Sequence, residues 1–231
     1  MDALEAIRTR RSIRKFSAEP LDFDVVTAII EAGHMAPSTG GLEARRFILC
    51  TDPHVIHGLK QFCMDQECFN TAQAIVVVCA LPEKVEAWYG PKGENVYSAH
   101  DAAAATENML LAAHNLGLGA VWVGGFDDEK IKAIFSIPSK SKAHAIVCLG
   151  FPAEVPSPKT TTPLQAVVYF NQYGNKIKNM HVVLRDYSLA IKAAMPEIEM
   201  KPIESRNVLS GLKKGVKNVK KSFFPPPKKG A

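Results

Sequence analysis

A run of arginines near the start of the chain has the residue types and spacing of a phosphate site. Arg10, Ser12 and Arg14 alternate within residues 8–16, so in an extended segment their side chains would point to one side. A guanidinium can bind a phosphate through two parallel hydrogen bonds, and a hydroxyl adds another donor. The alternation therefore predicts an anion site. The alternative is a basic stretch whose charges only face water.

Two glycine-containing segments could bring the backbone close to a ligand. Residues 36–41 form a loop of small residues, Ala-Pro-Ser-Thr-Gly-Gly, directly after a predicted helix. Residues 117–126 place glycines on both sides of a short strand pattern, which would free two backbone N–H groups to face a flat ligand. This second segment lacks the G-x-G-x-x-G turn at a helix start, so it does not predict a dinucleotide fingerprint. The first segment alone could equally be an ordinary turn.

Taken in this order, the three clusters resemble the nitroreductase family of FMN-dependent oxidoreductases, over roughly residues 4–171. Residues 10–16 resemble the family's Arg-Arg-Ser-x-Arg-x-Phe signature. Residues 101–113, followed by Gly-Leu-Gly, are similar to its central helix and the strand after it. Gly-Phe-Pro at residues 150–152 and the proline-rich arm that follows are also similar to the family pattern.

The resemblance implies FMN as the cofactor, bound at two sites between the subunits of a homodimer. The residues that it implies for the FMN phosphate and ribityl chain are Arg10, Arg11, Ser12 and Arg14. The residues that it implies for a flavin contact across the subunit boundary are Pro37, Ser38 and Thr39. The residues whose backbone it implies at the reactive edge of the isoalloxazine are Gly124 and Gly125.

The chain departs from the family pattern in two places. Where the family often has Asn and then Gln-Pro-Trp after the Pro-Ser loop, this chain has Gly41 and then Glu-Ala-Arg at residues 43–45. A side-chain contact to the flavin is therefore expected to be lost. A family arginine that commonly touches the phosphate after the proline arm is here Thr161. Lys159 and Arg45 are the candidates to compensate for it.

No catalytic acid or base is assigned, because in the family the flavin itself accepts and passes on hydride. His100 could lie near the site, but a capping or core histidine is the expected role. A rival interpretation is a metal site made by His54, His57, Cys63 and Cys68. The Cys-x4-Cys spacing is loose for zinc, and nothing makes both histidines converge with both thiols. We therefore expect no metal.

These residues need helices and strands to position them. Asp2 and Asp22 can cap two helices, the first with Leu4 and Ile7 turned inward. Further helices are predicted at residues 54–63, at 98–116, and from Asp127 or Asp128 to 135. Strands are predicted at residues 46–50, 74–80, 120–123 and 143–149. The apolar run 74–80 should be buried on both faces at the centre of a sheet, and the apolar helix 98–116 should lie inside the molecule or at a subunit interface.

The end of the predicted domain has a different texture. Residues 151–163 contain four prolines and predict an extended arm, with one more strand at residues 166–170 that could pair on another subunit. The element order predicts an α/β or α+β layered domain. The resemblance implies an α+β, nitroreductase-like three-layer fold with a central mixed sheet flanked by helices, in an intertwined homodimer. The FMN-binding domain would span residues 1–175, and a C-terminal extension residues 176–231.

Composition and charge limit the class of protein. The 231 residues are 47% apolar and 22% charged, which is typical of a globular chain. No apolar run has the length of a membrane span and no signal-peptide pattern is present, so a cytoplasmic protein is expected. Five cysteines, an odd number, predict reduced thiols. Residues 199–231 hold nine of the 28 basic residues and two of the 23 acidic ones. The rest is mildly acidic, which argues against general nucleic-acid binding.

The resemblance implies a dimeric enzyme that takes hydride from NADH or NADPH and reduces a small flat acceptor of the quinone or nitroaromatic type in a ping-pong cycle. The alternative is a non-catalytic flavin-binding protein, or an interaction protein recruited to a membrane or a partner, in which the basic tail is the functional part. Reduction of the bound flavin by NAD(P)H would separate these two classes.

The tail has the pattern of a basic amphipathic helix. Apolar residues recur at spacings of three and four at Leu209, Leu212, Val216, Val219 and Phe223, with lysines on the other sides. Gly211 and Gly215 each weaken such a helix by roughly 1 kcal/mol relative to alanine, so it should form only against a surface. That surface is either the body of the dimer or an anionic membrane or acidic partner.

If the tail binds anionic membranes, the full chain will co-sediment with anionic vesicles at low salt and will be released at high salt, because the attraction of lysines to the bilayer is screened by ions. A chain shortened to end at Pro196 will do neither and will keep its flavin. Equal sedimentation of the two chains would contradict the membrane hypothesis, and loss of flavin or dimer on shortening would indicate a packed tail.

Overall fold

The computed structural model describes residues 1–176, which fall into two compact units, residues 1–156 and residues 157–176. The strands are β1 (Arg45–Cys50), β2 (Ala74–Ala80), β3 (Gly119–Val123) and β4 (Lys142–Gly150). The helices are α1 (Ala3–Thr9), α2 (Phe23–His34), α3 (Pro53–Gly58), α4 (Pro82–Lys92), α5 (Ser98–Asn115), α6 (Asp128–Ile134) and α7 (Leu164–Val167). The amphipathic tail lies outside the described residues. It stays a prediction, as does the domain boundary after residue 175.

The four strands form one sheet in the order β1-β2-β4-β3, and every neighbouring pair is antiparallel. Ile75 of β2 lies opposite Cys50 of β1 and Cys148 of β4. The register shifts between Val78 and Cys79 of β2, where β4 has a bulge. The expected mixed sheet is corrected by this pairing: within residues 1–176, the parallel component is a single bridge between Ser12 and Ala120.

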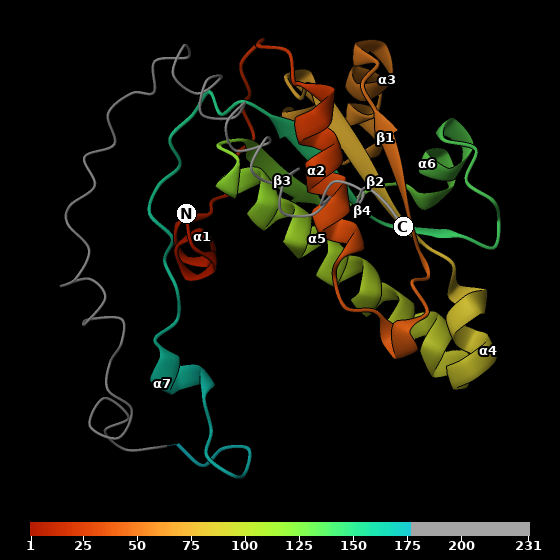
Figure 1. Cartoon of the computed structure of the whole chain (residues 1–231), viewed down its shortest axis with the longest axis vertical. Coiled ribbons are helices and arrows are strands. Elements are labelled where there is room, and N and C mark those ends of the chain that lie inside the picture. The colour runs from red at the N-terminus through yellow and green to blue at the C-terminus, as the bar shows by residue number, and fades with distance from the viewer. Residues whose placement is uncertain (177–231) are drawn as a thin grey trace, which may run out of the picture. The chain divides into compact units, whose positions relative to one another are not determined.

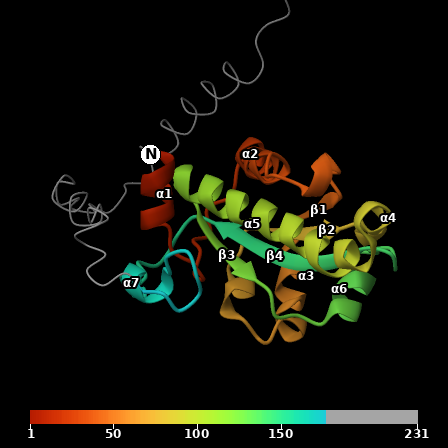
Figure 2. The same ribbon diagram turned by 90° about the horizontal axis from the view of Figure 1, so that it is seen from below.

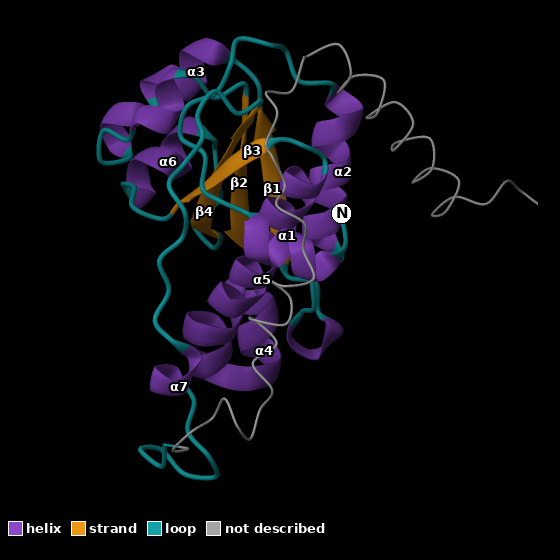
Figure 3. Ribbon diagram, turned by 90° about the vertical axis from the view of Figure 1, so that its left-hand side faces the viewer, coloured by secondary structure: helices purple, strands orange, loops and turns teal. Residues whose placement is uncertain are grey.

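The strand β2 is buried on both faces, as its apolar run predicts. Ile75, Val77 and Cys79 point into one hydrophobic core, which includes residues of α3 and α6. Val76 and Val78 point into the other core, which includes residues of α2 and α5. Figures 1 and 2 show the resulting three layers, with α2 and α5 on one face of the sheet and α3 and α6 on the other, and Figure 3 shows the strands between the two helical layers. This confirms the α+β three-layer fold.

The long helix α5 is confirmed within one residue of its predicted end. Gly117, at φ +80°, follows it in the left-handed conformation that suits glycine at a helix end. The packing of α5 on α2 is close at Gly33, where a Cβ atom would lie 2.7 Å from Cγ of Met109. Asn108 of α5 donates to the carbonyl of Ala32 at 3.1 Å. Eight of its residues are buried, whereas most of the others are half-buried, so part of this apolar helix has no cover from the described residues.

Two expectations about packing are wrong. Asp2 caps α1 as predicted, but Leu4 and Ile7 are 61% and 56% exposed rather than turned inward, because the small Ala6 is the residue that packs. The strand expected at residues 166–170 is absent from the described structure. A one-turn helix, α7, occupies residues 164–167 instead, because a strand needs a neighbouring edge and these residues have none in the described chain.

The predictions about the cap of α6, the reduced cysteines and the extended arm agree with the structure. Asp127, not Asp128, caps α6 by accepting from Lys130 N at 3.0 Å. All five cysteines are free thiols, and four are buried. Residues 153–163 of the arm contain no helix or strand. None of the helices in residues 1–176 combines the length and apolar character that crossing a membrane requires.

We expect Ile75→Ala to lower the free energy of unfolding by about 2–5 kcal/mol, because Ile75 is fully buried and the cavity would lie between sheet and helices. Ile134→Ala, at a residue that is 41% exposed, should change it by less than about 1 kcal/mol. Urea denaturation of both variants checks this. Equal losses would contradict the central place of β2 in the core.

Candidate functional site

Residues 8–16, here called the opening segment, are attached to the edge strand β3 through their backbone. Ile13, which is buried, donates its N–H to the carbonyl of Ala120 at 3.0 Å, next to the bridge made by Ser12. Gly119 permits this approach, since a Cβ atom there would lie 2.8 Å from Cγ2 of Ile13. The segment therefore has a fixed place beside β3, with Ile13 directed into the core.

Three of the four arginines in this segment, Arg10, Arg11 and Arg14, have different surroundings. Arg10 pairs with Glu107 of α5 at 3.2 Å, and its Nε is buried without a partner among the described residues. Arg11 donates to the carbonyls of Arg8 and Arg10 at 3.0 and 2.9 Å. The exposed Arg14 side chain makes no hydrogen bond or ion pair with another described residue. Arg14 can therefore bind an anion without giving up a contact within residues 1–176.

The positive charge of the segment also acts on the end of α5. His114 Nε2 lies 2.8 Å from the hydroxyl oxygen of Thr9. Burial lowers the pKa of His114, and the nearby Arg10 and Arg11 lower it further. The imidazole is therefore neutral at pH 7 and joins α1 to α5 through a hydrogen bond.

Two buried polar side chains hold the loop with the Pro-Ser-Thr sequence. The Arg45 guanidinium donates to the carbonyls of Pro37 and Ala36, each at 2.8 Å. Asp101, in the first turn of α5, accepts from the N–H and the hydroxyl of Thr39 at 2.9 and 2.8 Å. Burial lowers the pKa of Arg45, while Asp101 and Glu43 act in the opposite direction. The loop is thus anchored to β1 on one side and to α5 on the other.

The loop anchor corrects one expectation and adds a residue. Arg45 cannot compensate for the missing phosphate arginine, because it is 4% exposed and its guanidinium is directed at loop carbonyls. The sequence pattern identifies Asp101 only as part of the central helix and predicts no role for its side chain. The signal that could have identified it is a carboxylate in the first turn of an Ala-rich apolar helix, where it is 5% exposed.

The glycine pair after β3 presents unpaired backbone donors. Neither the N–H of Gly124 nor that of Gly125 donates to another described residue. A Cβ atom at Gly125 would lie 2.5 Å from Sδ of Met64, and one at Gly124 would lie 3.5 Å from Nε1 of Trp122. These two amides can therefore face a ligand. A side chain at Gly125 would displace Met64, whereas a Cβ atom at Gly124 would make only an ordinary contact with Trp122.

The structure joins two of the three predicted clusters. The opening segment pairs with β3, and Gly124 and Gly125 directly follow β3, so both belong to the same edge of the sheet. The Pro37–Thr39 loop is held instead at the first turn of α5, whereas the opening segment meets Glu107 and His114 further along that helix. No hydrogen bond among the described residues connects this loop to the other two clusters.

The residues present fit the FMN that the resemblance implies. The Arg14 side chain has no hydrogen-bond partner among the described residues, and neither has the buried Nε of Arg10, so both can serve a phosphate. The amides of Gly124 and Gly125 can serve the edge of a flat ring. The substituted positions add nothing to this fit: Gly41 has no side chain, and Glu43 is exposed at φ 52°.

The remaining sequence candidates are a histidine, two residues of the arm and a set of possible metal ligands. His100 is exposed, so the expected core role is wrong, and the start of α5 has no side-chain cap hydrogen bond. Thr161 and Lys159 are exposed on the separate unit that begins at residue 157. Within residues 1–176, no three His, Cys, Asp or Glu side chains are arranged to hold a metal ion, and Cys68 instead lies 3.7 Å, sulfur to sulfur, from Cys148. A cavity of about 650 Å³ near the start of α2 and α3 is lined by none of the predicted site residues.

Comparison with known proteins places these features in a family. A family model described as the nitroreductase family matches residues 7–74 and 63–151. The NADPH-flavin oxidoreductase of Vibrio harveyi is 31% identical over 180 residues, which cover 74% of this chain and 75% of that protein. The structure of the NADPH:FMN oxidoreductase from Vibrio harveyi complexed with NAD+ matches with a TM-score of 0.68 at 26% identity, covering 92% of this chain and 96% of that one. An FMN-dependent nitroreductase from Clostridium difficile matches with a TM-score of 0.64 at 25% identity, covering 74% and 99%.

Asp101→Ala should lower the free energy of unfolding by about 1–3 kcal/mol, because it leaves the N–H and hydroxyl of Thr39 without an acceptor. Asp101→Asn keeps one carbonyl oxygen for these donors and should lose clearly less. Urea denaturation of the two variants measures the difference. Equal effects would show that the Thr39 hydrogen bonds do not hold the loop.

Proposed function

The chain belongs to the nitroreductase family and is an FMN-dependent oxidoreductase that uses NAD(P)H, and we propose that it passes the electrons to a small flat acceptor of the quinone or nitroaromatic type. The observation that carries the proposal is made at β3. Two segments attached to this strand hold the Arg14 side chain and the backbone amides of Gly124 and Gly125, and none of these donors has a hydrogen-bond partner among the described residues. A cytoplasmic location is in keeping with five free thiols.

The phosphate end of the cofactor is assigned to the opening segment. In this proposal the residues that bind the phosphate and ribityl chain are Arg10, Arg11, Ser12 and Arg14. Arg14 needs no rearrangement, whereas Arg10 would share its guanidinium between the ligand and Glu107. Since charge-assisted hydrogen bonds are stronger than neutral ones, Arg14 should contribute most of the phosphate affinity that a single side chain supplies.

The ring end of the cofactor is assigned to the glycine pair. Bound FMN supplies the hydride chemistry, accepting hydride from a nicotinamide and passing electrons to the acceptor. The N–H groups of Gly124 and Gly125 would donate to the ring edge and stabilise negative charge there, in the manner of an oxyanion hole. No side chain is assigned as acid or base. A ping-pong cycle follows from this assignment, since nicotinamide and acceptor would both need the open face of the ring.

A second subunit is needed to complete this site. The Pro37, Ser38 and Thr39 loop is anchored at the first turn of α5, away from the opening segment, and we assign it to the flavin of the partner subunit in a homodimer. The exposed apolar residues Leu4 and Ile7 favour such a dimer, because they are large apolar side chains on α1 that the described residues leave mostly uncovered.

The proposed function is tested by purifying the full chain and recording its absorbance and its reaction with NAD(P)H. We expect a yellow dimer with about one FMN per subunit, and rapid bleaching of the flavin in stopped-flow mixing with NADH or NADPH, followed by reoxidation by a quinone. Flavin that binds and stays oxidised would favour the non-catalytic alternative. A colourless protein that does not bind added FMN would contradict the proposal itself.

Arg14→Ala should weaken FMN binding by about 1.5–3 kcal/mol, roughly 10- to 100-fold in Kd, because one charged hydrogen-bond donor to the phosphate is lost. The control is Lys140→Ala, which removes one positive charge from an exposed residue paired with Glu83. Titration of FMN with each apoprotein, followed by flavin fluorescence, measures both values. An unchanged Kd for Arg14→Ala would assign Arg14 to the solvated surface.

A further inference from the structure

Met64 is an exposed methionine held on an unusual stretch of backbone. Its side chain is 79% exposed. Met64 and Asp65 both have positive φ, 55° and 51°, a region in which residues with a Cβ atom are rare. Asp65 N–H donates to the carbonyl of Lys60 at 3.1 Å, which holds this turn in place. An apolar side chain kept in water by a strained turn points to a role outside the packing of this chain.

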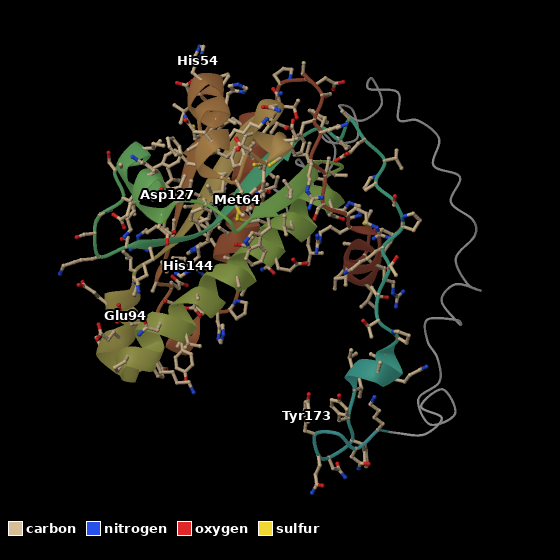
Figure 4. The ribbon with its side chains drawn as sticks, turned by 180° about the vertical axis from the view of Figure 1, so that it is seen from behind. His54, Met64, Glu94, Asp127, His144 and Tyr173 are labelled. Carbon is tan, nitrogen blue, oxygen red and sulfur yellow. The ribbon has the colours of Figure 1, made fainter. Side chains whose placement is uncertain are left out.

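The Met64 side chain lies against the glycine pair that follows β3. A Cβ atom at Gly125 would come within 2.5 Å of Met64 Sδ, so the thioether occupies the space beside this glycine and would have to move if the glycine were replaced. The backbone carbonyl of Phe62 accepts from the N–H of Asp127 at 2.8 Å, which connects the Met64 turn to the segment after Gly125. Figure 4 labels Met64 and Asp127 on these two segments. The turn that carries Met64 is thus joined to the segment after Gly125, and the Met64 sulfur lies next to Gly125.

Trp122 adds a second large side chain beside the same pair. It is 38% exposed on the edge strand β3, and its Nε1 would lie 3.5 Å from a Cβ atom at Gly124. The two free amides are therefore bordered by an exposed indole and an exposed thioether. An apolar border around polar backbone donors is the composition of a site for a small, flat, partly polar molecule.

We propose that Met64 is a specificity-determining residue that forms one wall of the place where flat ring substrates stack. This inference rests on the proposed function, because it requires the flavin ring to face Gly124 and Gly125. A thioether makes favourable contacts with aromatic ring edges, and the flexible methionine side chain adapts to rings of different shape. The substrates that Met64 contacts are quinones and nitroaromatics. Small inorganic oxidants that take electrons without stacking do not need it.

The test compares the full-length holoprotein with its Met64→Ala and Met64→Leu variants. Menadione is the ring acceptor and ferricyanide is the acceptor that does not stack. We expect Met64→Ala to raise the KM for menadione by about 2- to 10-fold, as loss of a sulfur–aromatic contact implies. Leucine keeps the apolar volume and should stay within about twofold of the original value, as should kcat/KM for ferricyanide in both variants. An unchanged KM for menadione in Met64→Ala, or an equal change for ferricyanide, would overturn the proposal.

A second measurement does not depend on turnover. Dilute hydrogen peroxide converts an exposed thioether to the sulfoxide, with water as the other product, and mass spectrometry reports the rate at Met64. With oxidised holoprotein and no NAD(P)H, saturating menadione should slow this reaction at least about threefold relative to N-acetylmethionine in the same tube. An unchanged rate at Met64 would also overturn the proposal.

Failure of this inference is distinguishable from failure of the proposed function. The unsubstituted protein must first bind FMN and be bleached by NAD(P)H. If it does neither, the flavin assignment is wrong. If it does both and the Met64 variants and the sulfoxide rates match the controls, the flavin assignment stands and Met64 is a surface residue.

Discussion

Burial of the two central strands on both faces of the sheet is the constraint from which the arrangement of this molecule follows. Every side chain of β2 is buried, and so are those of β4 from Ala145 onward. Such a sheet must be covered on both faces, so helices pack on each side. The edges of the sheet remain available for hydrogen bonds with other segments. The edge strand β3 is therefore available to pair with Ser12 and Ile13. The N–H groups of Gly124 and Gly125, which follow β3, donate to no described residue.

The candidate site is accordingly made mostly of backbone positioned by side chains that point elsewhere. Ile13 packs in the core, so its neighbours Ser12 and Arg14 face outward. The Arg45 guanidinium donates its hydrogen bonds to loop carbonyls. Side chains with such supporting roles decide where a ligand atom can be met, although they need not touch it. Substitutions at Arg45 and Asp101 would thus act on binding through the position of the loop.

The sequence predicts the helices and strands that local sequence determines. It does not predict contacts that depend on residues far away in the chain or on another molecule. The β2 run and the α5 pattern identify themselves, because a β-branched apolar stretch and an Ala-rich helix ended by glycine need no information from elsewhere in the chain. The role of Arg45 could not be inferred, since its acceptors at residues 34–37 become neighbours only in the folded chain. Residues 166–170 have a strand composition but no edge to join in the described chain, and Leu4 and Ile7 have apolar side chains without a described surface to cover them.

The anchored Pro37–Thr39 loop has a consequence for association kinetics. Arg45 and Asp101 order this loop within its own chain, so its conformational entropy is lost during folding rather than at the encounter with another molecule. A surface that is ordered in advance binds without further loss of loop conformational entropy and docks close to rigidly. Complex formation at this loop should therefore be limited by diffusion and orientation, with little of the slow rearrangement that a flexible loop would require.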